Sequence, residues 1–305
     1  MSEVKREPDG VLVVNKHKGP TSHDIVNKIR RLYGTKKVGH TGTLDPMAEG
    51  VLVILIGRAA KAAEYLATDS KKYRATLRLG IETDTQDVTG ETLKKFDGEL
   101  PSHEEVCAVC REFVGRIEQV PPMYSALKVG GKKLLDLARQ GITIERQARP
   151  VEIFSISCEP VSESDYTLDV HCSGGTYIRT LCADIGERLG CGGTMATLCR
   201  TETGGFPIEK SYTISQLEEM SDNERLSLLI STEELFSSLG QVKLPAFYEK
   251  LCRSGCEIYQ KKIKTDFALG ERVRICDEKG DFFALGEVRE YENGTAIKAI
   301  KTFNL

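Results

Sequence analysis

The most restrictive feature of the sequence is a run of six apolar residues, Val51–Ile56. A continuous run of aliphatic residues without polar alternation is typical of a strand that is buried on both faces. The run is also far shorter than the roughly 20 residues that a membrane-spanning helix needs. We therefore expect a sheet that is covered on both sides, and no membrane segment.

The rest of the pattern predicts an α+β fold. Residues 72–79 alternate between apolar and polar, with Tyr73 on the apolar face, as in a half-buried strand. Further strands are predicted at 11–15, 151–157 and 166–172, and helices at 22–34, 59–66, 102–113, 134–139, 177–189 and 213–239. We expect a mixed, mostly antiparallel sheet with flanking helices.

The pattern changes after Gly240. Short β-like runs occur at 273–276, 282–289 and 295–303, and the Asn293-Gly294 pair is a strong hairpin signal. We therefore predict two domains, a large one at residues 1–240 and a small β-rich one at residues 241–305.

The charge is nearly balanced overall but uneven along the chain. The 305 residues include 42 Lys or Arg and 45 Asp or Glu, which argues mildly against a nucleic-acid partner, because duplex-binding domains are usually basic. However, residues 11–40 contain seven Lys or Arg and one acid, and residues 128–149 contain six and two. These basic segments can contact phosphates although the whole chain is not basic.

The N-terminus and the cysteines both indicate a reducing, cytoplasmic location. The sequence MSEVKREPDG has no apolar signal-peptide core, and a chain of this length builds a core without disulfides. Cys107 and Cys110 form a C-x-x-C just after His103, but a zinc site would need a second ligand pair, which Cys252 and Cys256 supply poorly. We expect these thiols to pack on a helix and expect no metal; a structural or redox role is the alternative.

The residues most suggestive of chemistry lie in the loop Gly39–Pro46, GHTGTLDP. Asp45 precedes a proline, which favours an extended backbone, and the glycines allow close approach to a ligand. An ordinary turn made by the aspartate is the alternative. A basic helix precedes this loop, Tyr73 is a candidate exposed aromatic, and a second glycine loop leads to Tyr177 and Arg179. Basic groups mixed with aromatics suit unstacked bases and phosphates.

Four stretches of the chain resemble one known family. They are GVLVVNKHKGPTSHDIVNKIRRLYGTKKVGHTGTLDPMAEGVLVILIGRAAK, KKYRATLRLGIETDTQDVTG, QVPPMYSALKVGGKKLLDLARQGI and CSGGTYIRTLCADIGERLGCGGTMATLCRTETGGF. In this order they closely resemble the bacterial tRNA pseudouridine synthases of the TruB type, over most of residues 10–210. The C-terminal 65 residues are similar in general texture to the RNA-binding PUA domain of that family.

The resemblance implies an activity. It implies that the enzyme isomerises uridine to pseudouridine at position 55 in the tRNA T-loop, with no metal and no organic cofactor. The implied partner is the T-arm of tRNA, and we expect a monomer that needs no protein partner and no membrane.

The resemblance also implies roles for individual residues. Asp45 matches the catalytic aspartate, Tyr73 the residue that stacks on the flipped base and handles a proton at C5, and Arg179 the cation that pairs with the aspartate. Further residues match positions for substrate or RNA binding: Tyr177 and Leu198 in the pocket, and His40 against the displaced RNA loop. Lys16 and Lys18, from the basic stretch at residues 11–40, are further candidates for RNA binding.

The chain departs from the family pattern at three places: it has Asn15-Lys16-His17 where the family commonly has D-K-P, Gly174 where it commonly has Lys, and Thr194 where it commonly has His. Two other functions are consistent with the basic stretches. One is an RNA-binding or tRNA-folding protein without chemistry, against which the intact set of Asp45, Tyr73 and Arg179 argues. The other is a guide-dependent pseudouridine synthase acting on ribosomal RNA.

Overall fold

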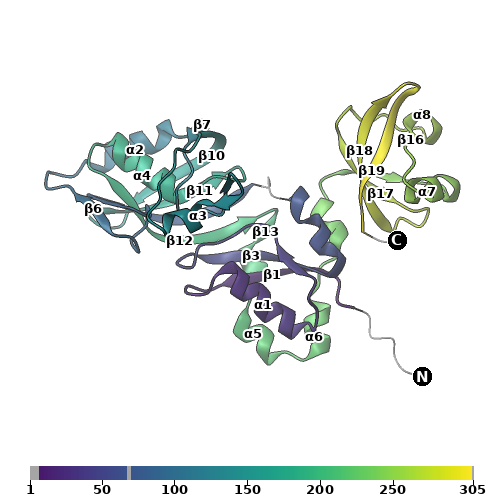
Figure 1. Cartoon of the computed structure of the whole chain (residues 1–305), viewed down its shortest axis with the longest axis horizontal. Coiled ribbons are helices and arrows are strands. Elements are labelled where there is room, and N and C mark those ends of the chain that lie inside the picture. Colours follow the sequence, from purple (N-terminus) through teal and green to yellow (C-terminus); the bar gives the residue numbers. More distant parts are fainter. Residues whose placement is uncertain (1–6, 67–69, 304–305) are drawn as a thin grey trace.

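The structure is a computed structural model that describes residues 7–66 and 70–303, so the first six residues of the polar N-terminus lie outside the described part. Two sheets dominate it (Figure 1): a large one in the first 213 residues and a smaller one after residue 240. The smaller, β-rich unit lies to one side of the rest, in yellow and green in the figure.

The large sheet has ten strands in the order β14-β1-β3-β12-β4-β11-β10-β7, with β13 paired to β12 and β2 to β3. Its strands are β1 (Gly10–Lys16), β2 (Val38–His40), β3 (Glu49–Ile56), β4 (Lys71–Leu79), β7 (Gly115–Gln119), β10 (Arg149–Pro160), β11 (Asp165–Cys172), β12 (Gly193–Thr203), β13 (Phe206–Pro207) and β14 (Tyr212–Thr213). The β1–β14 and β3–β12 pairs are parallel and the others are antiparallel. The predicted mixed, mostly antiparallel sheet is thus confirmed.

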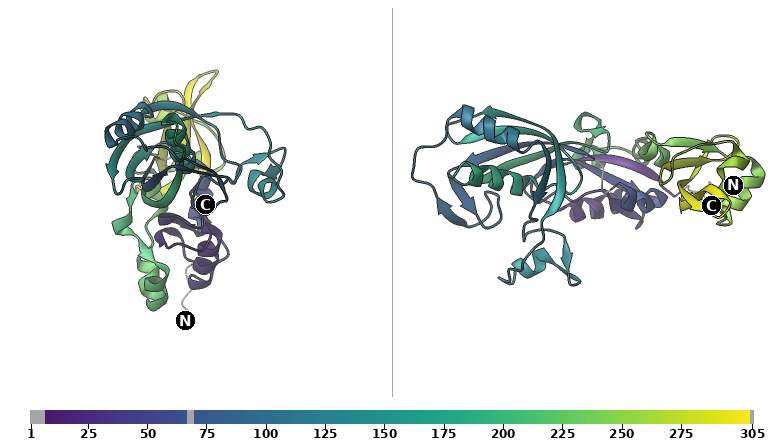
Figure 2. Two further views of the ribbon diagram at one scale, coloured as in Figure 1. Left: turned by 90° about the vertical axis from the view of Figure 1, so that its left-hand side faces the viewer. Right: turned by 90° about the horizontal axis from the view of Figure 1, so that it is seen from above.

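Helices and two small hairpins surround this sheet. The helices are α1 (Ser22–Leu32), α2 (His103–Glu112), α3 (Leu134–Ala138), α4 (Ile178–Arg188), α5 (Ile214–Glu219) and α6 (Asp222–Ser227), with 3-10 turns η1 (Gly57–Tyr65), η2 (Ile208–Lys210) and η3 (Thr232–Phe236). The hairpins are β5 (Ile81–Thr83) with β6 (Thr92–Lys95), and β8 (Lys128–Val129) with β9 (Lys132–Lys133). The segment that contains α3 projects from the body in both views of Figure 2; we call residues 121–148 the arm.

The C-terminal unit is a five-stranded sheet with two helices. Its elements are β15 (Gly240–Lys243), α7 (Ala246–Arg253), β16 (Ile258–Tyr259), α8 (Gln260–Ile263), β17 (Arg272–Cys276), β18 (Phe282–Tyr291) and β19 (Gly294–Thr302). The hairpin predicted from Asn293-Gly294 joins β18 to β19.

The strand Val51–Ile56 explains why the sheet has cores on both sides. Its side chains are at most 2% exposed and alternate between two hydrophobic clusters. Leu52 and Ile54 join the cluster beneath the helices, whereas Val51, Val53 and Leu55 join a second cluster that includes Phe282 and Phe303 of the C-terminal unit. The C-terminal unit shares this second cluster through η1 and η3: Phe236 packs against Phe282 and Phe303, and the Tyr65 hydroxyl donates to the Ile300 carbonyl at 3.2 Å.

Two expectations about secondary structure were wrong or incomplete. The acidic stretch 213–239 is not one helix, because Thr213 and Ser221 each start a short helix with its own capping box, and η3 follows. The central strand β12 went unrecognised, because register shifts after Met195 and after Arg200 break the alternation that marks a strand.

The remaining sequence expectations concern membranes and cysteines. Among the described residues, no helix is long and apolar enough to cross a bilayer. Cys107 and Cys110 lie on α2 as expected, where Cys110 is 1% exposed and the Cys107 thiol donates to the Cys158 carbonyl at 3.3 Å.

Candidate active site

Asp45 lies in a loop that is pinned at both ends. The Ser22 hydroxyl, at the start of α1, accepts from the Leu44 amide at 2.8 Å and donates to the Leu44 carbonyl at 3.0 Å. On the other side of Asp45, the Gly19 amide donates to the Pro46 carbonyl at 2.9 Å. The Asp45 side chain keeps 35% of its surface exposed, so a substrate can reach it.

Lys16 is placed differently from the expectation. It is fully buried at the end of β1, and its ammonium donates to the carbonyls of His17, Pro46 and Ala48 at 3.1, 3.3 and 2.5 Å. Burial lowers the pKa of Lys16 to about 8. Because its donors are used inside the protein, Lys16 is not available to a phosphate here; it holds the loop that follows Asp45.

Arg179 is brought to Asp45 by the first turn of α4. Its side chain is 6% exposed, and its Nε lies 2.9 Å from the Asp45 Oδ2. Its other nitrogens donate to backbone carbonyls, Nη1 to Thr85 at 2.9 Å and Nη2 to Tyr124 at 2.8 Å. These bonds fix the guanidinium plane, so the ion pair with Asp45 has one defined geometry.

A second acid, Asp87, shares Arg179 and was missed in the sequence. Its Oδ2 lies 3.8 Å from the Arg179 Nη1, while its Oδ1 accepts from the Thr89 amide at 3.0 Å. Gln86, which directly precedes Asp87, adopts a left-handed φ of 63°, which is strained for a residue other than glycine. Asp87 is 5% exposed. Its burial and the strained residue before it mark it as a functional candidate, and neither feature can be read from the sequence.

The environment of Asp45 sets its ionisation. Burial is the main cause that raises the pKa of Asp45 above its ordinary value of 3.8; the Arg179 guanidinium opposes this, the nearby Asp87 adds to it, and Lys16 opposes it. The expectation that Arg179 favours the ionised form holds in direction, but burial outweighs it. Asp45 is therefore a partly shielded carboxylate that titrates above the usual range.

Tyr73 and Leu198 lie on neighbouring strands beside this ion pair. They are each 7% exposed, so Tyr73 is not the exposed aromatic that we expected. On β4 its Cα pairs with that of Arg200, and Leu198 on β12 pairs with Ala75. Burial raises the pKa of Tyr73, and Asp45 contributes to the same shift, so the phenol is near enough to sense the carboxylate.

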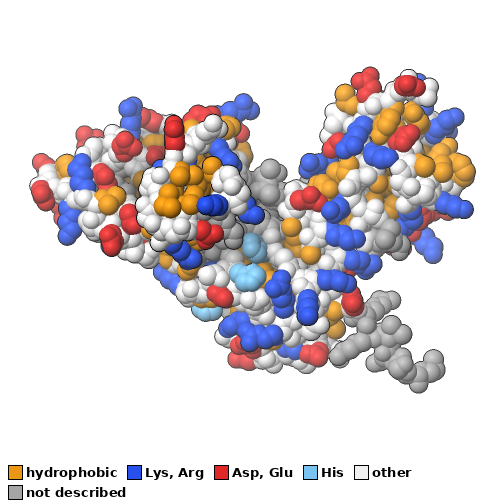
Figure 3. Space-filling model, viewed as in Figure 1, with side chains coloured by type: hydrophobic (Ala, Val, Ile, Leu, Met, Phe, Trp, Pro, Cys, Tyr) orange, Lys and Arg blue, Asp and Glu red, His pale blue; other side chains and the backbone are white. Residues whose placement is uncertain are grey.

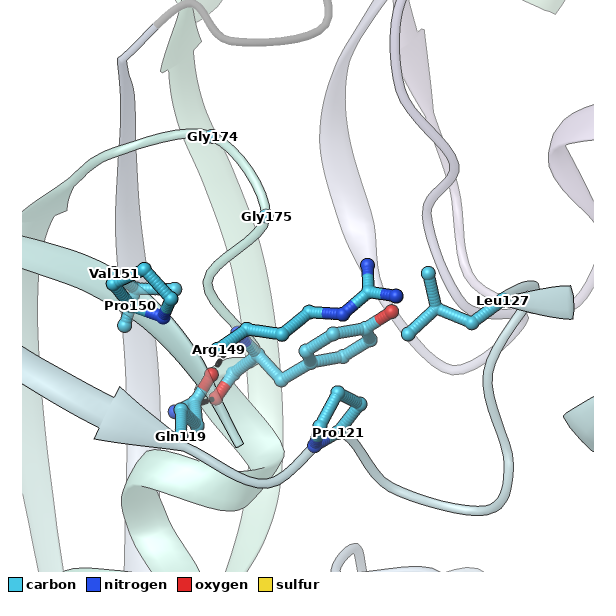
Figure 4. Close-up of a pocket in the computed structure, with 9 residues that line it drawn as sticks. Gln119, Pro121, Leu127, Arg149, Pro150, Val151, Gly174 and Gly175 are labelled. Atoms are coloured by element: carbon cyan, nitrogen blue, oxygen red, sulfur yellow. Dashed lines mark hydrogen bonds between the residues drawn. The ribbon is translucent and has the colours of Figure 1, made fainter. Parts of the chain in front are cut away.

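Tyr177 lines a pocket of about 210 Å³ (Figure 4) together with Gln119, Pro121, Leu127, Arg149 and the Gly174-Gly175 loop. Gln119 holds the Tyr177 backbone: its Oε1 accepts from the amide at 2.8 Å and its Nε2 donates to the carbonyl at 3.0 Å. Figure 4 shows Arg149 extending across the pocket toward Leu127. Apolar walls and one cation suit a base and its phosphate.

The two remaining predicted RNA contacts, His40 and Lys18, differ in exposure. His40 ends β2; its Nδ1 is buried without a partner among the described residues, and burial and the Arg200 guanidinium lower its pKa. Lys18 is exposed. In the space-filling view, histidine side chains lie near the centre of the face, and Lys and Arg side chains extend from there over the lower part of the molecule toward the C-terminal unit (Figure 3).

The described residues contain no group of three or more His, Cys, Asp or Glu side chains that could hold a metal ion. The site instead consists of one reachable carboxylate, a fixed guanidinium, and a phenol and a leucine in an otherwise apolar centre. Such a site can stabilise or attack an electron-poor carbon of a small, flat substrate.

Comparisons with known proteins agree with this description. Residues 30–178 match the family described as "TruB family pseudouridylate synthase (N terminal domain)", and residues 179–236 match "tRNA pseudouridylate synthase B C-terminal domain". The chain is 42% identical to "tRNA pseudouridine synthase B" of Alkaliphilus oremlandii, over 96% of this chain and 98% of that one. It is 45% identical to the protein of the same name from Syntrophotalea carbinolica, over 74% of each chain.

Solved structures show the same fold. A chain of "Crystal Structure of a Cbf5-Nop10-Gar1 Complex" is 25% identical with a TM-score of 0.75, covering 97% of this chain and 85% of that one. A chain of "Structure of H/ACA RNP bound to a substrate RNA containing 2'-deoxyuridine" is similar in fold, with a TM-score of 0.74, 23% identity, and coverage of 98% of this chain and 86% of that one.

Proposed function

The chain belongs to the TruB family of pseudouridylate synthases, so it isomerises uridine to pseudouridine in tRNA, and we propose that it does so at position 55 of the T-loop with Asp45 as the catalytic residue. The observation that carries the role of Asp45 is its geometry. It is a reachable carboxylate, paired at 2.9 Å with a buried arginine and set among apolar side chains.

The reaction exchanges one bond for another within the same nucleotide. The N1–C1′ bond breaks, the base turns, C5 bonds to C1′, and C5 loses its proton while N1 gains one. Because the uridine is stacked in a folded RNA loop, it must first be flipped out, at a cost of a few kcal/mol. The Asp45 carboxylate then acts as a nucleophile, as a base, or as the charge that stabilises an oxocarbenium-like state.

The other site residues divide the remaining tasks. Tyr73 stacks on the flipped uracil and handles the proton at C5, and Leu198 and Tyr177 complete the pocket. Arg179 keeps Asp45 oriented and favours its ionised form, since a nearby cation stabilises a carboxylate away from water. His40 occupies the space that the displaced nucleotides leave in the RNA loop.

Phosphate contacts come from basic segments outside the catalytic centre. The arm includes Lys128, Lys132, Arg139 and Arg146, and it projects from the body, so it can reach along a stem. Lys18 lies exposed near the loop of Asp45. We further propose that residues 1–240 are the catalytic domain and that residues 241–305 are a PUA-like domain that binds RNA.

We further propose that the protein acts on tRNA in the cytoplasm as a monomer that needs no protein partner, as its homology to bacterial tRNA-modifying enzymes suggests. The main competing function is a tRNA-folding protein without chemistry. The Asp45–Arg179 pair argues against it, because RNA binding alone gives no reason to hold a buried arginine against an acid. A guide-dependent enzyme for ribosomal RNA is less well supported, because the curated relatives at 42–45% identity are named for tRNA.

One experiment separates these possibilities. A tRNA transcript with tritium at uridine C5 is incubated with the protein alone, and tritium release is followed. We expect release equal to one uridine per tRNA, and none from a matched transcript with cytidine at position 55. Unchanged release from the cytidine transcript would refute the position. No release from bare tRNA would refute the proposed function; release that appears only with an added guide RNA would then support the guide-dependent enzyme, and no release in either case the tRNA-folding protein.

A further inference from the structure

We infer that Arg200 is a positioning residue that holds Tyr73 and the loop of Asp45 in one geometry. The inference rests on the proposed function, since it assigns Arg200 a part in presenting the base-stacking side chain and the catalytic carboxylate together. Arg200 lies on β12. This strand runs between β3, which follows the Asp45 loop, and β4, which carries Tyr73.

Arg200 is the largest of the fully buried side chains, at 1% exposure. No ion pair involves it among the residues that the structure describes. A buried guanidinium without a carboxylate partner is costly unless its donors are satisfied in another way. The structure satisfies them with main-chain oxygens, so the contacts of Arg200 are specific rather than incidental.

Three backbone carbonyls accept hydrogen bonds from Arg200. Its Nε donates to Val51 in β3 at 2.8 Å, its Nη2 to Gly42 at 3.1 Å, and its Nη1 to Thr43 at 3.5 Å. Gly42 and Thr43 precede Asp45 by three and two residues. Arg200 therefore fixes the incoming half of the loop, and Lys16 fixes the outgoing half through the Pro46 and Ala48 carbonyls.

The same guanidinium lies beside the phenol of Tyr73. The two residues are cross-strand partners in the β4–β12 ladder, and Tyr73 is buried at this point. The Arg200 guanidinium lowers the Tyr73 pKa, against the larger effect of burial. The cross-strand pairing thus places one planar group beside the strand position of the ring that stacks on the base, while its hydrogen bonds hold the loop that carries the acid.

The backbone is built to bring Arg200 close. Gly50, where β3 begins, has a φ of +100°, and a Cβ added there would lie 2.3 Å from the Arg200 carbonyl oxygen. No other residue type fits this contact, which lets β3 run directly beside Arg200. A lysine in place of Arg200 would keep the charge. However, its ammonium lacks the planar set of donors of a guanidinium, so it could not bond β3 and the Asp45 loop and also lie beside Tyr73.

The test compares Arg200→Lys and Arg200→Met with Arg74→Met as the matched control. Arg74 is the neighbour of Tyr73 in β4, but it is exposed and bonded to Asp169 at 2.8 and 3.0 Å. For each protein, stoichiometric titration with tRNA counts the binding sites, and tritium release with enzyme in excess gives the single-turnover rate constant per site.

We expect Arg200→Met to lower the rate constant by about a hundredfold, as for a misplacement of about 1 Å, while tRNA affinity changes by less than about tenfold. Arg200→Lys should recover about tenfold of this loss, and Arg74→Met should match the wild type. Tyr73→Phe removes only the hydroxyl of the cross-strand partner of Arg200. If Arg200 positions this hydroxyl, adding Tyr73→Phe to Arg200→Met should cost less than it costs in the wild type.

Three results would overturn the inference. The first is a rate per binding site equal to that of the wild type in both variants, because Arg200 would then have no part in the reaction. The second is a complete loss of binding sites in both variants, because Arg200 would then serve folding alone. The third is a full multiplicative effect of Tyr73→Phe in the Arg200→Met background. Inactivity of the wild type on the uridine-55 transcript would instead refute the proposed function, so the two failures are distinguishable.

Discussion

Removal of Arg179 should move the pH at which Asp45 becomes active. In the wild type the Arg179 Nε lies 2.9 Å from the Asp45 Oδ2, and burial already raises the Asp45 pKa. An opposite charge at this range lowers a carboxyl pKa by about 1–3 units, equivalent to about 1.4–4 kcal/mol. Arg179→Met should therefore raise the Asp45 pKa further, because the cation that opposes the effect of burial is gone.

The direction of the pH dependence follows from the charge that the reaction needs. If the carboxylate is the active form, the rate rises with pH through the Asp45 pKa and is lost as the pH falls below it. In Arg179→Met the whole limb shifts to higher pH, and each pH unit below the new pKa costs about tenfold in rate. Asp87 adds to this shift of the limb. Once Arg179 is removed, the negative charge of Asp87 near Asp45 is no longer balanced by the cation that the two acids share.

The assay is single-turnover tritium release with enzyme in excess, from about pH 5 to about pH 9, with Arg179→Lys as the control. Lysine keeps a charge near Asp45 but loses the bonds to the Thr85 and Tyr124 carbonyls, so it should shift the limb less and lower the plateau. A limb at the same pH in the wild type and Arg179→Met would refute the argument that this ion pair controls Asp45.

Two further predictions concern the basic residues and the domain contact. Lys16→Met should lower the free energy of unfolding by about 2–4 kcal/mol, because it leaves buried carbonyls unpaired, and it should not change the salt dependence of tRNA binding. Lys18→Ala should leave the free energy of unfolding unchanged and reduce the salt slope of tRNA binding by about 1. Urea unfolding and binding at several salt concentrations measure both, and equal salt slopes in wild type and Lys18→Ala would rule out a phosphate contact. Deletion of residues 241–305 should lower the melting temperature and cause aggregation, because it uncovers the apolar side chains around Phe236, which packs against Phe282 and Phe303; a soluble fragment with unchanged melting temperature would contradict this.

Much of the fold could be predicted from local patterns. Strands with clean alternation, such as β4, and helices with a capping box, such as α1 and α2, follow from neighbouring residues alone. The strand β12 could not be predicted in this way, because its bulges are defined by pairing with β4 across a long stretch of sequence. The acidic segment after Thr213 was misread because composition favours a helix, whereas the capping residues divide it.

The candidate site shows the same limit. The resemblance located Asp45 and Arg179, and the structure brings them together. It could not separate Lys16 from Lys18, because two lysines in one basic stretch differ only in burial. Asp87 and Arg200 were missed because a charged residue looks like a surface residue until the fold encloses it.

The central claim is that Asp45 performs the isomerisation rather than assisting RNA binding. Asp45→Asn keeps the shape of the side chain and removes its charge, so it is the most direct test. We predict that tritium release from the uridine-55 transcript falls to background while tRNA affinity stays within about tenfold of the wild type. Release at a rate near that of the wild type would contradict the account.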